Sequence, residues 1–157
     1  MKIALAVPLA VLLGACAATG APAPAPTVVP QAEHQRAQAQ QATGPTANTG
    51  IESVKALGTV PLAQELEGAG NRVLRARELV IEPGGVVAVH QHERRPGVAY
   101  VLEGEMTEFR GDPAQPVVHG VGSVALEWTG VTHWWENRGK VRARALVVDI
   151  VPAEPAK

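Results

Sequence analysis

Short valine-rich segments separated by glycine and proline occupy the second half of this chain, and they restrict its fold more than any other feature. Glycine permits a positive φ and proline fixes φ at the entry to a turn, so sequences such as Pro83-Gly84-Gly85 are expected to end strands. No long amphipathic helix interrupts the series. The pattern predicts an all-β domain, an antiparallel sandwich or barrel. The expected strands cover residues 73–81, 86–92, 98–109, 123–128 and 141–151.

Three histidines lie within these segments: His90 and His92 are one residue apart, and His133 follows about 40 residues later. Alternate residues of a strand share a face, so His90 and His92 are expected to point the same way, with Val87 and Val89 on the opposite face. Three neutral imidazoles can bind one side of a divalent first-row metal and leave positions open for water or substrate. The trio therefore predicts a metal site that is open to chemistry.

Glycines at fixed distances from these histidines carry a resemblance to the cupin family. In the first cupin motif five residues separate a glycine from a His-x-His pair, as they separate Gly84 from His90, and a later glycine corresponds to Gly104. The second motif corresponds to Gly122, five residues, Trp128-Thr129-Gly130, two residues, His133, three residues and Asn137.

This resemblance covers roughly residues 70–151. It implies a single-domain cupin, which is a jelly-roll-like antiparallel β-barrel, with His90, His92 and His133 as the metal ligands. The strand pattern and the resemblance thus predict the same architecture.

The chain departs from the first motif at one ligand. The family usually has a glutamate there with six residues before the final glycine, and Gly97 stands at that position. Three neutral ligands would suit Zn, Cu, Fe or Ni better than Mn, which prefers an anionic oxygen. Glu93 is expected on the wrong strand face unless the following turn bends it back, whereas Glu103 shares the parity of Gly97. A second departure is Trp128, where the family usually has proline.

Strand alternation also predicts what surrounds the metal. His133, Trp135 and Asn137 share one face, so an inward His133 would bring Trp135 and Asn137 to the site. Trp135 is expected either to offer a flat surface to a ligand or simply to fill the core, and Asn137 to orient a ligand or a histidine. Ala99 and Val101 are expected to line the same substrate pocket and keep it apolar.

The first 15 residues resemble an export signal. A short apolar run follows Lys2, and Leu13-Gly14-Ala15-Cys16 resembles the lipobox of bacterial lipoproteins. We expect cleavage before Cys16, the only cysteine of the chain, and lipidation of its thiol. Cleavage after Ala17 by the ordinary signal peptidase, which would leave a soluble periplasmic protein, is the alternative. Ala17 after the cysteine resembles lipoproteins that are sorted to the outer membrane.

Residues 16–50 are expected to form a disordered tether rich in alanine, proline and glutamine. Alternating alanine and proline over residues 21–26 favours an extended conformation, and the stretch that follows lacks large apolar side chains. A helix over residues 33–41 would be too short to persist alone, so His34 is expected to be solvated. The barrel is then expected over residues 51–152, with residues 153–157 as a disordered tail.

Charge argues against a nucleic-acid partner, because 14 lysines and arginines face 15 acidic residues with no basic block. The expected partners are a small-molecule ligand, the membrane through the lipid anchor, and a second copy of the chain, since related cupins often pair as dimers. His119, near a strand end, is expected to be structural or exposed. Arg75, Arg77, Arg142 and Arg144 are expected first on solvated strand faces, and a carboxylate-binding role for one of them is the weaker alternative.

Two function classes follow from the site. The first is metal-dependent small-molecule chemistry, dioxygenase- or isomerase-like, because cupins with three histidines include dioxygenases, isomerases and decarboxylases. The alternative is a non-catalytic periplasmic module that binds or senses a small ligand or a metal. A third reading is a barrel whose site has decayed. The open ligand set and the nearby aromatic residues favour the first class, in a lipoprotein of the cell envelope that faces the periplasm.

Overall fold

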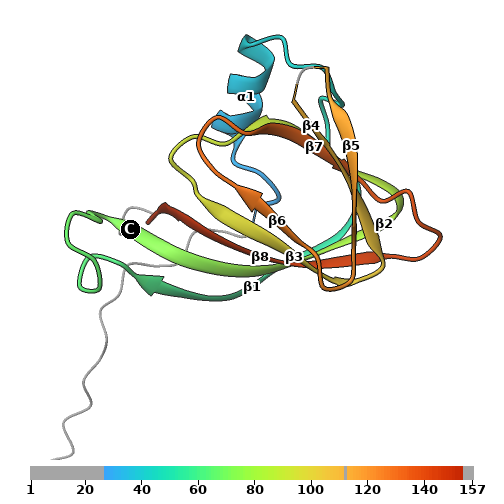
Figure 1. Cartoon of the computed structure of the whole chain (residues 1–157). Helices are drawn as coiled ribbons and strands as arrows, with labels where there is room; N and C mark the ends of the chain where they lie inside the picture. The colour runs from blue at the N-terminus through green and yellow to red at the C-terminus, as the bar shows by residue number, and fades with distance from the viewer. Residues whose placement is uncertain (1–26, 112, 154–157) are drawn as a thin grey trace, which may run out of the picture.

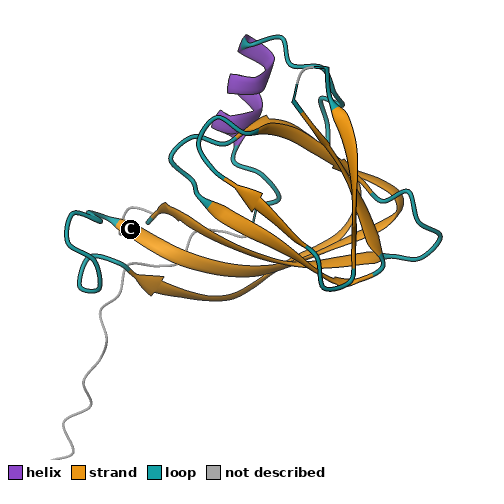
Figure 2. Ribbon diagram, in the orientation of Figure 1, coloured by secondary structure: helices purple, strands orange, loops and turns teal. Residues whose placement is uncertain are grey.

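The computed structural model describes residues 27–111 and 113–153. Over these residues the chain forms one helix and eight strands, which curve into a nearly closed antiparallel barrel with the helix at one end (Figures 1 and 2). The all-β barrel predicted from the sequence is thereby confirmed. The elements are α1 (Gln31–Ala39), β1 (Thr49–Pro61), β2 (Arg72–Gln91), β3 (Gly97–Glu103), β4 (Glu105–Arg110), β5 (Gln115–Gly120), β6 (Val124–Glu127), β7 (Thr132–Glu136) and β8 (Ala143–Pro152).

One long strand, β2, joins the two sides of the barrel. The strand order is β5-β4-β7-β2-β8-β3-β6, and β1 pairs with β2 outside this path. The first half of β2 pairs with β1 and β8, and its second half pairs with β7. The end of β2 therefore lies beside β7, which places His90 opposite His133.

Some strand boundaries differ from those expected. Strand β2 continues through Pro83-Gly84-Gly85, where two strands were predicted. The single strand expected over residues 98–109 is divided at Gly104, which adopts a positive φ of 69° close to the backbone of Arg142. Strand β1 was not predicted, because its residues are mostly exposed and mix polar with apolar side chains.

Residues 16–50 were expected to form a disordered tether, and this expectation is wrong for residues 31–39. Residues 31–39 form α1, which packs against β2. Glu33 is buried and binds Arg95, while Nδ1 of His34 donates a hydrogen bond to the carbonyl of Val89 at 2.9 Å. Tertiary contacts thus stabilise a helix that is too short to persist alone. The expected signal peptide and Cys16 lie outside the described residues, as do residues 154–157.

The apolar core fills the interior of the barrel. It is formed by small and branched side chains from several strands together with one tryptophan, which leaves space beside the end of β2. Among the described residues, no helix has both the length and the apolar character needed to cross a membrane. The main core side chains are Leu79, Ile81, Val87, Ala99, Met106, Ala125, Trp135, Ala143 and Val147.

Candidate metal centre

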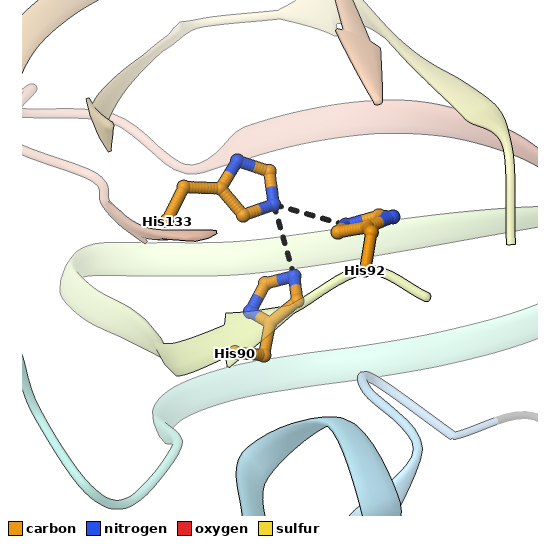
Figure 3. Close-up of side chains that lie close together, drawn as sticks. All are labelled: His90, His92 and His133. Atoms are coloured by element: carbon orange, nitrogen blue, oxygen red, sulfur yellow. Dashed lines mark hydrogen bonds between the residues drawn. The ribbon is translucent and has the colours of Figure 1, made fainter. Parts of the chain in front are cut away.

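His90, His92 and His133 meet inside the barrel, and their exposed fractions are only 0–2%. His90 on β2 is the direct register partner of His133 on β7, and His92 follows the end of β2 by one residue. Figure 3 shows the three rings pointing toward one another. A register shift between Val87 and His90 interrupts the alternation of β2, so both residues line the same cavity. The expectation that Val87 faces away from His90 is therefore wrong.

The separations between the ring nitrogens suit one shared ion. Nε2 of His133 lies 3.0 Å from Nε2 of His90 and 3.1 Å from Nε2 of His92 (Figure 3). Metal–nitrogen bonds of about 2.0–2.1 Å place two ligands of a single ion roughly 2.9–3.4 Å apart. Each histidine offers one ligand atom within 4.8 Å of the others. The three histidines are thus positioned to bind a metal ion.

The other ring nitrogens decide which form each imidazole takes. Each Nδ1 contacts an oxygen that accepts a hydrogen bond, so each Nδ1 carries the proton and each Nε2 presents a lone pair. No proton then lies between the three Nε2 atoms, whose facing lone pairs are suited to bind a cation. The oxygen acceptors belong to Ala88 (carbonyl, 2.9 Å from His90), Arg95 (carbonyl, 3.2 Å from His92) and Glu108 (carboxylate, 2.5 Å from His133).

Burial keeps the three imidazoles neutral. It lowers the pKa of His90 and of His133 well below the ordinary value of 6.5, and neighbouring histidines add to the effect. Burial, followed by the positive charge of Arg95, lowers the pKa of His92 to about 3. At neutral pH the nitrogens therefore do not have to lose a proton before they bind a metal.

Glu108 on β4 orients His133. One carboxylate oxygen accepts from Nδ1 of His133, and the other lies 3.0 Å from Nε2 of His119. Arg110 pairs with the same carboxylate at 2.7 Å. His119 is buried by these contacts and supports Glu108, which agrees with a structural role. Glu108 was not singled out from the sequence, although its register position opposite Trp135 places it beside β7.

A second carboxylate, that of Glu127 on β6, approaches the triad. Its oxygens lie 3.7 Å from Nε2 of His92 and 3.8 Å from Nε2 of His133. Burial raises the pKa of Glu127 to about 7, while Arg95 and Arg77 act in the opposite direction. Glu127 was missed because only the pairing of two strands brings it to the site.

Neither of the glutamates considered from the sequence reaches the metal site. Glu93 is half exposed and pairs with Arg36 on α1. Glu103 also remains partly exposed, where it binds Arg142 and Arg144. Glu127, which is the register partner of Gly97, is therefore the carboxylate nearest to the place left by the motif glutamate.

A cavity of about 50 Å³ adjoins the triad. Ala99, Val101 and Trp135 line it, together with His90 and Glu127. Trp135 is 6% exposed, and its ring meets that of His133 edge-on at 5.5 Å between centroids. Ala99, Val101 and Trp135 were predicted to line a substrate pocket, and in the structure all three line this cavity.

Asn137, in contrast, does not line the cavity. Its side-chain amide donates to the carbonyls of Ile81 at 3.0 Å and Val141 at 2.9 Å, and its side-chain oxygen accepts from the backbone N–H of Gly139. The side chain is fully buried, with both polar atoms bonded to backbone. Asn137 closes the turn after β7, and the expectation that it would orient a ligand is wrong.

Arg95 brings a positive charge to the edge of the triad. Its Nη2 lies 3.1 Å from Nε2 of His92. Two nitrogens of the same guanidinium bind both oxygens of Glu33, at 2.8 and 2.7 Å, and a third binds Asp149 at 2.8 Å. The guanidinium thus contacts the lone pair that a metal would use, and it ties α1 to the barrel.

Comparisons with known proteins agree with this architecture. Residues 77–149 match the family model described as Cupin domain. This match and the nearly closed antiparallel barrel fit a single-domain cupin. No curated protein matches the chain.

Several solved structures are similar to the chain. One is a protein of Thermus thermophilus, with 26% identity over 64% of this chain and 86% of the other and a TM-score of 0.46. A predicted oxalate decarboxylase of Thermotoga maritima has 18% identity over 66% and 97%, with a TM-score of 0.45. An oxalate oxidase has 23% identity over 66% and 55%, with a TM-score of 0.48.

Proposed function

We propose that this chain binds a divalent transition metal through His90, His92 and His133 and uses it for small-molecule chemistry of a dioxygenase- or isomerase-like kind. One observation carries the proposal. Three proton-free Nε2 atoms face one another in a buried space, and the cavity beside them is lined by His90. A closed structural site would leave no room for a second molecule, whereas this site opens onto that cavity.

Each residue of the proposed metal centre would have a distinct role. The three imidazoles hold the ion, and Glu108 fixes the ring of His133 through its Nδ1 proton. Glu127, whose oxygens lie 3.7 and 3.8 Å from Nε2 of His92 and His133, would supply a carboxylate to a bound ion in place of the missing motif glutamate. Apolar side chains such as Leu79, Val101 and Val147 form much of the wall of the adjoining cavity. A bound metal would act there as a Lewis acid that polarises a coordinated ligand.

The carboxylate of Glu127 widens the range of metals expected. Three neutral imidazoles alone suit Zn, Cu, Fe or Ni. An anionic oxygen ligand removes the argument against Mn, which rested on the absence of a carboxylate. For a chain exported unfolded through the general secretory channel and loaded outside the cytoplasm, the affinity order favours Cu or Zn.

Metal stoichiometry tests the proposal directly. The protein is stripped with a chelator, reloaded with zinc, and its metal content is measured by elemental analysis. We expect about one zinc per chain in the wild type, and loss of that zinc in His133→Ala, because one of three ligands is gone. His34→Ala is the matched control. This half-buried histidine lies near His90, but its Nδ1 donates a hydrogen bond to the backbone carbonyl of Val89. Full zinc retention in His133→Ala would contradict the assignment.

A non-catalytic binding module is the second candidate, and the position of α1 favours it. The Glu33–Arg95 ion pair holds this helix next to the triad, which suits retention of a ligand better than rapid turnover. Oxygen consumption by the iron- or copper-loaded protein with enol-type substrates distinguishes the two. Turnover supports the enzyme, while tight ligand retention with no turnover under any metal supports the module.

The cellular location is part of the same proposal. Support comes from Leu13-Gly14-Ala15-Cys16 and the apolar run before it. We expect the protein on the periplasmic side of the cell envelope, held in the outer membrane by a lipid on Cys16. Radiolabelled palmitate should enter the wild type and not Cys16→Ala. A labelled Cys16→Ala variant, or an unlabelled wild type, would contradict lipidation.

A further inference from the structure

Arg77 on β2 is a buried arginine that lines the cavity beside the triad, with an exposed fraction of 3%. Its Nη1 donates to the backbone carbonyls of Thr27 and Val28. Its Nη2 makes only a long contact of 3.4 Å with Asp149. Its Nε has no hydrogen-bond partner among the residues that the structure describes. Buried donors are almost always paired in folded proteins, so this Nε–H marks a place for an acceptor.

The two neighbouring buried arginines show what that acceptor should be. Arg75 donates from Nε and Nη2 to the two oxygens of Asp149, at 2.9 and 2.8 Å. Arg95 donates from the same two atoms to the two oxygens of Glu33. The Nε–Nη2 edge of a guanidinium fits a carboxylate, and two of the three edges in this cluster hold one. Among the described residues, the Nε–Nη2 edge of Arg77 is the one that holds no carboxylate in this arrangement.

Charge also calls for an anion once a metal is bound. Among the described buried residues around the cavity, three arginines face three carboxylates, and the remaining buried carboxylate, Glu108, pairs with Arg110. A divalent ion on the triad adds two positive charges that the protein does not balance, and unbalanced charge is costly in a water-poor interior. The three arginines are Arg75, Arg77 and Arg95, and the three carboxylates are Glu33, Glu127 and Asp149.

Arg77 remains charged under these conditions. Burial lowers its pKa to about 10, against the opposing effect of Asp149, and this value is still well above neutral pH. His90, Arg95 and Glu127 also line the cavity, and the remaining wall is apolar, with Leu79, Val101 and Val147 among its residues. Arg95 already binds Glu33 and Asp149, so within the described part of the chain the cavity offers one unpaired guanidinium edge, that of Arg77, beside a small apolar space.

We propose that this cavity takes a small organic carboxylate, whose oxygens accept hydrogen bonds from the Nε–Nη2 edge of Arg77 while its other end faces His90 and the metal. A water molecule needs about 10–15 Å³ of such space, so a cavity of about 50 Å³ holds a ligand of roughly three to five non-hydrogen atoms. The contact between the ligand's other end and the metal rests on the proposed metal centre. The contact between the carboxylate and Arg77 does not require a metal.

Acetate is the probe for this subsite, and acetamide is its neutral control of the same shape. Each is titrated into the zinc-loaded protein by calorimetry at constant ionic strength in chloride. We expect acetate to bind at least tenfold more tightly than acetamide, because only the carboxylate complements Arg77. Acetate should also raise the melting temperature, since a ligand of the folded state stabilises it.

Variants locate the subsite. Arg77→Gln is expected to weaken acetate binding at least tenfold while zinc content stays unchanged. Arg77→Lys keeps the charge, loses the two-pronged edge and should also weaken it. Arg144→Gln is the matched control, because Arg144 lies partly exposed on β8 and pairs with Glu78 and Glu103. If Arg77→Gln does not fold, Arg77→Lys and the acetate–acetamide comparison in the wild type decide the matter.

The outcomes separate this inference from the metal proposal. If the protein binds zinc but not acetate, even at ~0.1 M acetate, where weak sites also fill, the carboxylate subsite is overturned and the metal centre is unaffected. Equal affinity for acetate and acetamide, or unchanged acetate affinity in Arg77→Gln, also overturns it. Acetate binding by a wild type that takes up no zinc supports the subsite and overturns the metal centre instead.

Discussion

Gly97 on β3 and Glu127 on β6 are direct partners across the two strands, so a residue without a side chain lies beside the carboxylate that approaches the triad. The cupin motif that this chain resembles usually has its glutamate at the position of Gly97. Here the neighbouring strand brings a carboxylate to nearly the same place. A carboxylate is thereby present near the three histidines, although the residue that carries it stands elsewhere in the sequence.

The first prediction concerns the close packing of Gly97 against β8. A Cβ at this position would lie 2.7 Å from the carbonyl oxygen of Val148 and 2.9 Å from Cβ of Asp149. We expect Gly97→Ala to lower the free energy of unfolding by about 1–3 kcal/mol, measured by urea denaturation. Gly58→Ala is the control, because a Cβ there meets nothing within 4 Å. Equal stability of the two variants would show that β8 yields easily.

Glu127 gives a prediction about metal preference. Glu127→Gln keeps the shape of the side chain but removes the anionic oxygen, which hard ions such as Mn need more than Cu does. We expect manganese affinity to fall at least tenfold and copper affinity to change less, as measured by competition with a chelating dye. Glu103→Gln, partly exposed and paired with Arg142 and Arg144, should leave both affinities unchanged. Unaltered manganese binding in Glu127→Gln would exclude the carboxylate from the ligand sphere.

Glu108 should tune the affinity of the site without touching the ion. In Glu108→Gln the bond to Nδ1 of His133 loses its charge, so His133 becomes a weaker ligand. We expect zinc affinity to fall about 10–100-fold, the usual effect of removing such an orienting group. The control is Glu136→Gln on β7, which is partly exposed and pairs with Arg138. A drop of the same size in both variants would argue for a general loss of charge rather than orientation of His133.

The metal-free protein should lose stability in acid. The folded-state pKa of His92, about 3, lies below its ordinary value of 6.5, so its contribution is complete above about pH 6.5 and is lost as the pH falls toward 3. His90 and His133 act in the same direction. Glu127 acts oppositely, because its raised pKa of about 7 gives stability below pH 4.5 that is lost as the pH rises through 7. The three histidines together are expected to change the folding stability more than Glu127 does, so the net effect of acid is a loss of stability.

Urea denaturation at pH 7.5 and pH 5 checks this expectation. For His92 the loss at pH 5 is about 2 kcal/mol, since each pKa unit corresponds to about 1.4 kcal/mol. His92→Asn should therefore show a smaller pH dependence than the wild type by about that amount. An identical pH dependence in the two proteins would mean that His92 is not held neutral by burial.

The ion pair between Glu33 and Arg95 should hold α1 in place. Glu33→Gln leaves a buried guanidinium with fewer acceptors, and we expect a loss of about 3 kcal/mol together with faster amide exchange along α1. Glu93→Gln removes the partly exposed partner of Arg36 on the same helix and should cost less than about 1 kcal/mol. Unchanged amide exchange in Glu33→Gln would show that other contacts retain the helix.

The fold and the triad could be predicted because their signals are local. Valine-rich segments between turn residues indicate strands, and the distances from Gly84 to His90 and from Gly130 to His133 lie within single turns or strands. The bulge between Val87 and His90 could not be predicted, since one additional residue reverses the face of a strand without changing its composition.

Residues brought in by distant parts of the chain were missed for a different reason. Glu127, Glu108 and Arg95 are charged residues within or beside strands, and from the sequence such residues look like solvated faces. The register of β6 with β3 directs Glu127 inward and that of β4 with β7 directs Glu108 inward, while Arg95 lies in the loop between β2 and β3 and is held by Glu33 and Asp149. The order of α1 depends on Glu33, whose partner stands 62 positions further along the chain.

The carbonyls of Thr27 and Val28 rest on Arg77, so the segment that enters the barrel is fastened to the same guanidinium that lines its cavity. Recombinant versions that begin after residue 1 should therefore keep the native residues from Thr27 onward. An affinity tag joined directly at this point would disturb the contacts of Arg77, and a change in ligand binding would then reflect the position of the tag rather than the native pocket.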